Sequence, residues 1–189
     1  MCVALLTIPG KVIDNASLFN GWNSNPHGGG FAYVRDDKVV IEKGFMEYNA
    51  FQKAYAAATE KYAADSPFLV HMRIRTSGAT NANNCHPFPI RGGALIHNGI
   101  MFTPTGKRAG APGDRKSDTR VFAESLYNIL NLEHIQKKES AIQSAIGYGN
   151  KICFLYDDKQ YFILGEKSGD WIDGIWHSND SCARRRSSR

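Results

Sequence analysis

Apolar residues recur along this chain in short runs, and most of the runs have the length of a β-strand. The first occupies residues 2–8 and stops at Pro9-Gly10, which predicts a buried strand followed by a turn. Two later pairs of runs flank Asp36-Asp37 and Asp157-Asp158, which predicts two hairpins. In all, strands are expected at residues 2–8, 31–35, 38–43, 67–74, 94–97, 151–156 and 160–165, with a short segment at 174–177.

Other apolar residues recur every three or four positions, which predicts helices. The clearest stripe comprises Tyr48, Phe51, Tyr55, Ala58 and Tyr62, and we expect its aromatic rings to pack in the core. A helical turn is expected around residues 16–22. Ser117-Asp118 predicts the start of a later helix. Its expected buried face carries Val121, Phe122, Leu126 and Ile129, and one further helix carries Ile135, Ile142 and Ile146.

Between these elements lie segments rich in Asn, Gly and Pro. Residues 75–92 predict a long irregular loop and residues 102–117 a mobile flap, while the glycines at 28–30 predict a close approach of the backbone to another segment. The order of strands and helices favours an α+β fold with stacked, mainly antiparallel sheets and helices outside, rather than a doubly wound parallel sheet. With no repeat or long linker, one domain is expected over residues 2–180.

The composition is that of an ordinary globular protein, with 42% apolar and 22% charged residues. The net charge is +5, and much of the excess lies at the end of the chain, in Arg184, Arg185, Arg186 and Arg189. Residues 181–189 are expected to be a basic, disordered tail. Weak attraction of Arg184–Arg189 to nucleic acid is an alternative, and we rank it last because no aromatic residues are interleaved there.

The four cysteines, Cys2, Cys85, Cys153 and Cys182, are widely and irregularly spaced. This spacing predicts reduced thiols and a cytoplasmic protein, and neither a signal peptide nor a membrane-spanning run is apparent. A metal site made of Cys85, His86 and His97 is conceivable, but its spacing matches no common zinc motif. We therefore expect no metal and no cofactor.

Candidate chemistry begins at Cys2. If Met1 is removed, this residue carries a thiol nucleophile together with a free α-amine whose reference pKa is about 8, so that the amine can act as a base. Asn98 and the backbone N–H of Gly99 would supply two donors to an oxyanion. Arg73 would bind a carboxylate, and Asp118 would bind an ammonium group.

Each of these residues also has a simpler interpretation. Cys2 is equally typical of a small buried apolar residue, and Asn98-Gly99 of a hairpin turn. Arg73 is equally typical of a surface salt bridge at a strand end. Asp118 is equally typical of the first turn of a helix.

Taken together, the motifs resemble the class II glutamine amidotransferase domain of the N-terminal nucleophile hydrolases, in its stand-alone form. The resemblance covers roughly residues 1 to 180. The motifs that carry it are Met1-Cys2, Asn-Pro-His-Gly-Gly-Gly-Phe-Ala-Tyr at 25–33, His-Met-Arg-Ile-Arg-Thr-Ser-Gly at 71–78, Asn-Cys-His-Pro-Phe at 84–88, His-Asn-Gly-Ile at 97–100 and Ser-Asp-Thr at 117–119.

The resemblance implies a four-layer αββα sandwich and a set of residue roles. Cys2 would attack the side-chain amide of L-glutamine or a similar amide through a thioester, releasing ammonia and glutamate. Asn98 and Gly99 would form the oxyanion hole. Arg73, helped by Thr76, would bind the α-carboxylate, and Asp118 the α-ammonium group.

The chain departs from the family pattern at three positions: Val3 replaces a frequent glycine, Arg75 a small residue and Ser77 a frequent histidine. No acceptor domain is apparent, so the resemblance implies a separate ammonia-accepting synthase or ligase, or hydrolysis of the amide alone. The alternative function is that of an inactive relative that senses glutamine or regulates a partner.

Overall fold

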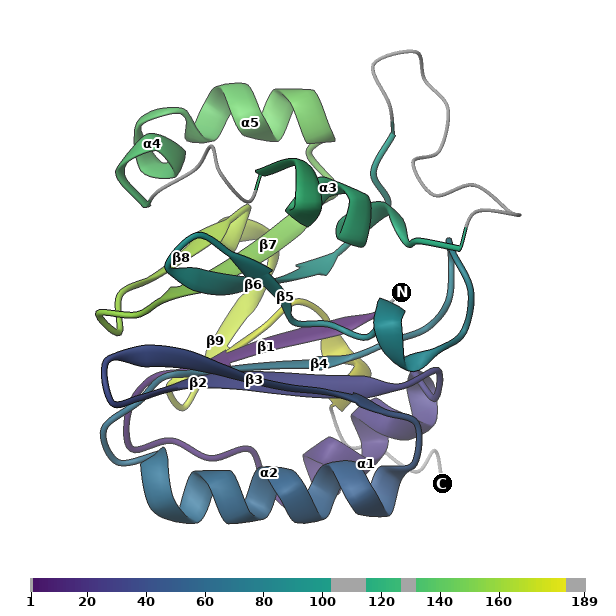
Figure 1. The fold of residues 1–189 in the computed structure, drawn as a ribbon, viewed down its shortest axis with the longest axis vertical. Coiled ribbons are helices and arrows are strands. Elements are labelled where there is room, and N and C mark those ends of the chain that lie inside the picture. Colours follow the sequence, from purple (N-terminus) through teal and green to yellow (C-terminus); the bar gives the residue numbers. More distant parts are fainter. Residues whose placement is uncertain (1, 103–114, 127–131, 183–189) are drawn as a thin grey trace, which may run out of the picture.

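The computed structural model describes residues 2–102, 115–126 and 132–182, and within them the elements form four layers (Figure 1). Two sheets lie face to face, with α1 and α2 outside one sheet and α3, α4 and α5 outside the other. All neighbouring strands are antiparallel. The expected α+β architecture with stacked antiparallel sheets and outer helices is therefore confirmed.

The larger sheet has the strand order β3-β2-β4-β1-β10-β9. It comprises β1 (Val3–Thr7), β2 (Gly29–Arg35), β3 (Lys38–Phe45), β4 (Phe68–Met72), β9 (Asp170–Ile172) and β10 (Ile175–His177). The smaller sheet comprises β5 (Phe88–Ile90), β6 (Gly93–Asn98), β7 (Lys151–Tyr156) and β8 (Tyr161–Leu164), in that order.

The helices are α1 (Asn15–Ser24), α2 (Tyr48–Tyr62), α3 (Asp118–Leu126), α4 (Leu132–Lys137) and α5 (Glu139–Ile146). A short 3₁₀ helix, η1, covers Ala82–Asn84. Two others, at Glu166–Ser168 and Asp180–Cys182, flank the last two strands. None of the helices in the described part of the chain is both long and apolar enough to cross a membrane.

Three apolar layers hold the structure together, because the central strands are buried on both faces. Successive side chains of a strand point to opposite faces, so Val3 and Leu5 pack toward α1 and α2 while Ala4 and Leu6 pack toward the smaller sheet. The layer between the sheets also contains Ala32, Val34, Leu69, Ala94, Ile96, Cys153, Leu155, Ile163 and Trp176. The third layer lies between the smaller sheet and α3–α5.

The two hairpins are confirmed, and their turns meet at one end of the sandwich. Asp36 and Asp37 have φ values of 51° and 53°, as a tight hairpin turn requires. In the other hairpin, the carboxylate of Asp157 accepts hydrogen bonds from Val39 N (2.8 Å) and Lys38 Nζ (2.9 Å). Asp157 therefore joins the smaller sheet to the larger one.

The expected stripe of α2 is also confirmed: Phe51, Tyr55 and Ala58 are buried, and Tyr48 and Tyr62 pack against the same cluster. The helix that precedes α2 in the chain, α1, is longer than the single turn that was expected. Its N-terminus is capped by Asp14, whose Oδ1 accepts a hydrogen bond from Ser17 N at 2.9 Å.

Several expectations were wrong. Residues 75–92 are not all loop, since they contain η1 and β5; the short strand β9 was also missed. The face of α3 that is buried carries Ala123, whereas Val121 is 43% exposed. The single further helix is two helices, α4 and α5. The disordered tail expected at 181–189 does not include its first two residues, because they belong to the 3₁₀ helix at Asp180–Cys182 and Cys182 is buried.

Other expectations lie outside the described residues. These are the state of Met1, most of the flap at 102–117, Ile129 and the side chain of Leu126 on the expected helix face, and the basic tail from position 183 onward.

The layer between the sheets generates a stability prediction. Ile96 is fully buried there, so Ile96→Ala is expected to lower the free energy of unfolding by about 2–5 kcal/mol. The matched control is Ile172→Ala at an edge strand, where the side chain is 56% exposed and the expected change is within about 0.5 kcal/mol. Urea denaturation measures both, and equal effects would contradict the assignment of this layer as a core.

Candidate active site

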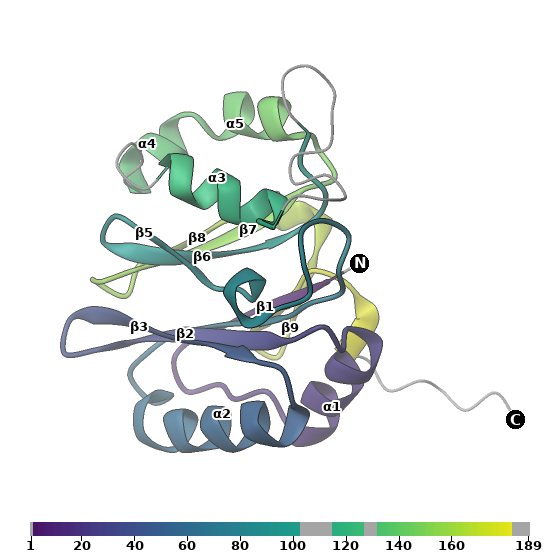
Figure 2. The ribbon, with the colours of Figure 1, turned by 45° about the vertical axis from the view of Figure 1, so that its right-hand side comes forward.

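Three of the expected site residues, Cys2, Arg73 and Asn98, lie at the ends of β1 and β4 in the larger sheet and of β6 in the smaller sheet, on the faces that pack against the opposite sheet. Val3 pairs with Met72 and Ala4 with His71, so continuing the register by one residue places Cys2 opposite Arg73. On β6, Asn98 follows Ala94 and Ile96 at every second position. The apolar layer between the sheets therefore becomes polar at the end marked N in Figure 2.

The Cys2 side chain is half-buried at the start of β1. Its Sγ lies 3.3 Å from Ile74 O and 3.4 Å from Ile74 N, so the thiol both donates to and accepts from the backbone of one residue. Burial raises the pKa of this thiol, and the N–H of Ile74 and the charge of Arg73 oppose that rise. The charge of Asp118 also acts on the thiol and raises its pKa.

The backbone of Cys2 is held by two amide side chains. Nδ2 of Asn98 donates to Cys2 O at 2.5 Å and contacts Ser178 Oγ at 2.7 Å, and Nδ2 of Asn179 donates to the same carbonyl at 2.8 Å. Ser178 Oγ in turn accepts from Ala4 N at 2.9 Å. Asn98 thus uses its amide hydrogens to position the first residues of β1.

Gly99 follows the end of β6 with a φ of 152°, a backbone conformation that favours glycine. A Cβ at this position would collide with Asn150 Oδ1 and would lie 2.8 Å from His97 Nε2. Asn98-Gly99 is not the turn of a hairpin, because β6 pairs with β7 across Asn98 and Lys151, far along the chain. The hairpin interpretation of this dipeptide is therefore wrong.

Arg73 is only 2% exposed, so it is not the surface residue of the simpler interpretation. Its NH1 donates to Ala79 O at 3.0 Å and its NH2 to Ser77 O at 2.6 Å. No ion pair to a carboxylate is formed by Arg73 within the described residues. A guanidinium group has five N–H donors, so these two bonds leave donors for an anion.

Asp118 is the first residue of α3 and is 5% exposed. Oδ1 accepts from Ser77 Oγ (3.0 Å) and Thr119 N (2.7 Å), and Oδ2 accepts from Met101 N (3.0 Å). Ser77 therefore bridges the two charged residues, because its carbonyl binds Arg73 while its hydroxyl binds Asp118. The sequence singled out Ser77 as a departure, and the structure gives it this bridging position.

The remaining residues of the loop after β4 differ in exposure. Thr76 is half-buried beside Ser77, whereas Arg75 is exposed and its backbone N donates to His27 Nδ1 at 2.8 Å. The side chain of Asn84 ties this loop to the start of α3. Its Nδ2 donates to Ala79 O and Arg115 O at 3.0 and 2.7 Å, and its Oδ1 accepts from Ser117 N at 3.0 Å.

Three buried histidines lie behind the site. The rings of His71 and His86 stack with centroids 3.8 Å apart, His71 Nε2 donates to His97 O at 3.0 Å, and His97 N donates to His86 Nδ1 at 3.2 Å. The His97 ring contacts Thr119 Oγ1 and Asn150 Oδ1 at 2.7 and 2.8 Å. Burial lowers the pKa of all three, that of His71 to about 3, so the imidazoles are neutral at pH 7.

The possible metal site at Cys85, His86 and His97 is not assembled. Cys85 Sγ lies against Met46 Sδ at 3.9 Å and Asn81 O at 3.7 Å, while His86 and His97 bond to each other. Across the residues that the structure describes, no group of three or more His, Cys, Asp or Glu side chains is arranged to hold a metal ion. All four cysteines are free thiols.

Residues that sequence reasoning did not select also build the site. Ser178 and Asn179 hold Cys2 and Asn98, although they lie more than 170 positions after Cys2. Asn150 requires glycine at position 99. These polar residues follow strand ends or turns without any local motif, so only the fold reveals them.

Comparison of the chain with protein-family models and with curated proteins gives no match. The site is therefore interpreted from its own geometry. Asn98 contacts the backbone of Cys2, and the charges of Arg73 and Asp118 act on the Cys2 thiol. These four residues come from four separate stretches of the chain.

The buried histidines generate a prediction of pH dependence. A pKa near 3 in the folded protein and about 6.5 in the unfolded chain means that the unfolded state binds the extra proton, so stability falls as the pH drops below about 6.5. For His71 alone, the free energy of unfolding is expected to fall by about 2 kcal/mol between pH 7 and pH 5.

His71→Gln keeps an N–H donor for His97 O but does not titrate. Urea denaturation at the two pH values is expected to show a loss about 2 kcal/mol smaller in this variant than in the wild type. Identical losses in His71→Gln and wild type would contradict a neutral, buried His71.

Proposed function

We propose that this protein is a glutamine amidotransferase or glutaminase of the class II, N-terminal nucleophile type, with Cys2 as its nucleophile. The observation that carries the proposal is the convergence on Cys2 of one amide, one guanidinium and one carboxylate: Asn98, Arg73 and Asp118. The four-layer arrangement of the sheets and helices supports it (Figure 1). The order of the sequence motifs supports it as well.

The reaction requires that the peptide bond before Cys2 be cleaved, which frees the α-amine of Cys2. The amine accepts the thiol proton while the sulfur attacks the side-chain carbonyl carbon of glutamine. The tetrahedral intermediate collapses as the proton passes to the leaving nitrogen, which releases ammonia and leaves a thioester. Water, deprotonated by the same amine, then attacks the thioester and frees glutamate and the thiol.

Asn98 and Gly99 are the proposed donors to the oxyanion. The Asn98 amide now contacts Cys2 O and Ser178 Oγ, so stabilising the oxyanion requires one of these contacts to be exchanged. Cleavage of the peptide bond before Cys2 changes the backbone at this residue. If Asn98 then releases Cys2 O, the carbonyl oxygen still accepts the hydrogen bond from Asn179 Nδ2. The exchange therefore leaves the carbonyl partnered.

Arg73 and Asp118 are the proposed clamp for the α-carboxylate and α-ammonium groups of the substrate, with Thr76 beside Arg73. Buried charges interact strongly because little water screens them. The Ser77 bridge fixes the two charges relative to each other before a substrate arrives. Arg75, the extra cation of this loop, is exposed, whereas Arg73 and Asp118 are buried.

A second candidate function is that of a binding or regulatory subunit that holds glutamine without hydrolysing it. Two observations favour it: burial raises the pKa of the Cys2 thiol, and the Asn98 amide is engaged. If the protein is active, the released ammonia passes to a separate synthase or ligase or to solvent.

The first functional prediction concerns the nucleophile. Purified protein is expected to release glutamate from L-glutamine, and Cys2→Ala is expected to abolish that release because no other group supplies the thioester. Cys153→Ala is the matched control, since Cys153 is a buried thiol in the core between the sheets. Coupled detection of glutamate measures the rates.

Mass spectrometry of the intact chain completes this test, because the α-amine must be free. Glutamate release that persists in Cys2→Ala, or in protein with Met1 still attached, would refute the mechanism. No release by protein that begins at Cys2, together with saturable calorimetric binding of glutamine, would favour the regulatory function instead.

The second functional prediction concerns the clamp. Arg73→Gln and Asp118→Asn each remove one charge while keeping hydrogen-bonding atoms, and each is expected to lower kcat/KM for glutamine by about 10- to 100-fold, chiefly through KM. The exposed Arg91→Gln serves as the charge-matched control. Thermal melts check that the variants are folded; unchanged KM values in both folded variants would argue against the clamp.

A further inference from the structure

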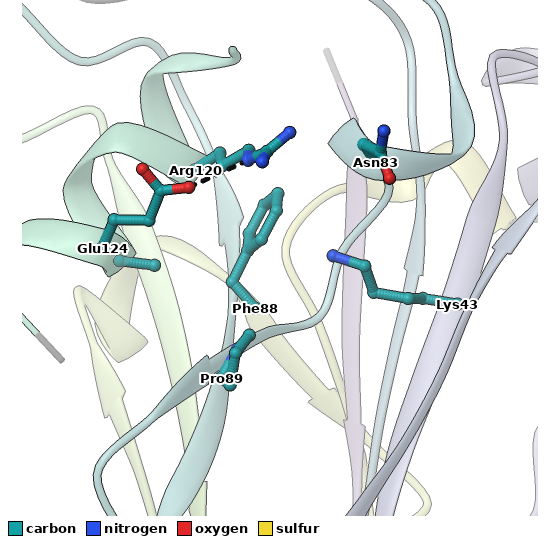
Figure 3. Close-up of a pocket in the computed structure, with 7 residues that line it drawn as sticks. Lys43, Asn83, Phe88, Pro89, Arg120 and Glu124 are labelled. Atoms are coloured by element: carbon teal, nitrogen blue, oxygen red, sulfur yellow. Dashed lines mark hydrogen bonds and ion pairs between the residues drawn. The ribbon is translucent and has the colours of Figure 1, made fainter.

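A cavity lies between β3, β5, η1 and α3, and the candidate active-site residues do not line it (Figure 3). Its volume is about 450 Å³, which is within the range of small-molecule sites. The apolar part of the cavity wall is formed by Phe88, Pro89 and Ala123. Polar groups come from Lys43, Asn83, Arg120 and Glu124.

Lys43 presents an uncompensated cation to this cavity. Its Nζ lies 4.0 Å from the centroid of the Phe88 ring, and the ammonium forms no ion pair or hydrogen bond within the described part of the chain. Burial lowers its pKa to about 8, so the amine remains mostly protonated at neutral pH. An anion placed here would restore favourable interactions to a partly desolvated charge.

Arg120 enters the cavity from the opposite wall (Figure 3). Its Nε donates to Glu124 Oε1 at 3.0 Å, and the other oxygen of Glu124 binds Lys116 Nζ at 2.7 Å. The one carboxylate is therefore shared by two cations. The terminal nitrogens of Arg120 make no other hydrogen bond among the described residues, so they remain available to an oxyanion.

The charges and the apolar wall together define the class of ligand. Lys43, Arg120 and Lys116 outnumber Glu124, which favours an anion over a cation. A free inorganic anion would leave the wall of Phe88, Pro89 and Ala123 uncovered. We propose that this cavity binds a small organic anion, with a carboxylate or phosphate between Lys43 and Arg120 and an apolar body against Phe88.

This site is distinct from the proposed glutamine site but is built on the same two segments. Asn83 precedes Asn84, whose side chain holds Ser117 N, and Arg120 lies two residues after Asp118 in α3. A ligand in the cavity therefore contacts both η1 and α3, the two segments that the hydrogen bond from Ser117 N to Asn84 joins next to Asp118. The proposal concerns binding and does not depend on the glutaminase reaction.

The test is calorimetric titration with phenyl phosphate, benzoate, inorganic phosphate and the neutral benzyl alcohol. Phenyl phosphate or benzoate is expected to bind saturably, and inorganic phosphate and benzyl alcohol at least about tenfold more weakly. Comparing the two organic anions distinguishes a phosphate ligand from a carboxylate ligand. Inorganic phosphate that binds as tightly as phenyl phosphate would overturn the role of the apolar wall.

Variants locate the probe. Lys43→Met, which keeps the packing against Phe88, and Arg120→Gln are each expected to weaken binding by about tenfold, whereas Lys43→Arg should retain it. The exposed Lys53→Met and Arg91→Gln are the charge-matched controls. The proposal is overturned if neither organic anion binds saturably, if Lys43→Met and Arg120→Gln match the controls, or if binding is lost only in Arg73→Gln, which would place the probe at the glutamine clamp.

Discussion

The face-to-face packing of the two sheets is the constraint on which the rest of the structure depends. Packed sheets lie about 10 Å apart, so every second residue of β1, β4 and β6 must fit a thin layer. In the middle of that layer the residues are small or apolar, as Ala4, Leu69 and Ile96 are. At one end the same alternation reaches Cys2, Arg73 and Asn98, so the periodicity that builds the core also aligns the candidate site.

Burying these polar residues is costly unless each finds a partner. The fold meets this requirement with backbone carbonyls for Arg73 and with a hydroxyl and two backbone N–H groups for Asp118. Neither residue therefore needs the other as a direct ion-pair partner. The consequence is a pair of fixed charges that can each accept a new counter-charge without first breaking a salt bridge.

The sequence predicted the elements with strong periodicity, including β1, both hairpins and α2, and it selected Cys2 and Asn98, which the fold brings into contact. It missed β5, because that strand has three residues with Pro89 at its centre, which an edge strand tolerates. It missed Ser178 because a serine after a short strand has no periodic signal. The helix face was wrong at Val121, because the side of α3 that packs in the cluster with the smaller sheet carries Ala123 instead.

Asp157 ties the two sheets together at one end of the sandwich. Its carboxylate fastens the β7–β8 hairpin to the β2–β3 hairpin, and Figures 1 and 2 place this fastening at the end opposite the start of β1. The sheets are also joined at the end where β1 starts, by the bond from Asn98 to the carbonyl of Cys2 and by the bond from His71 to the carbonyl of His97. The apolar layer between the sheets is therefore closed by polar contacts at both of its ends.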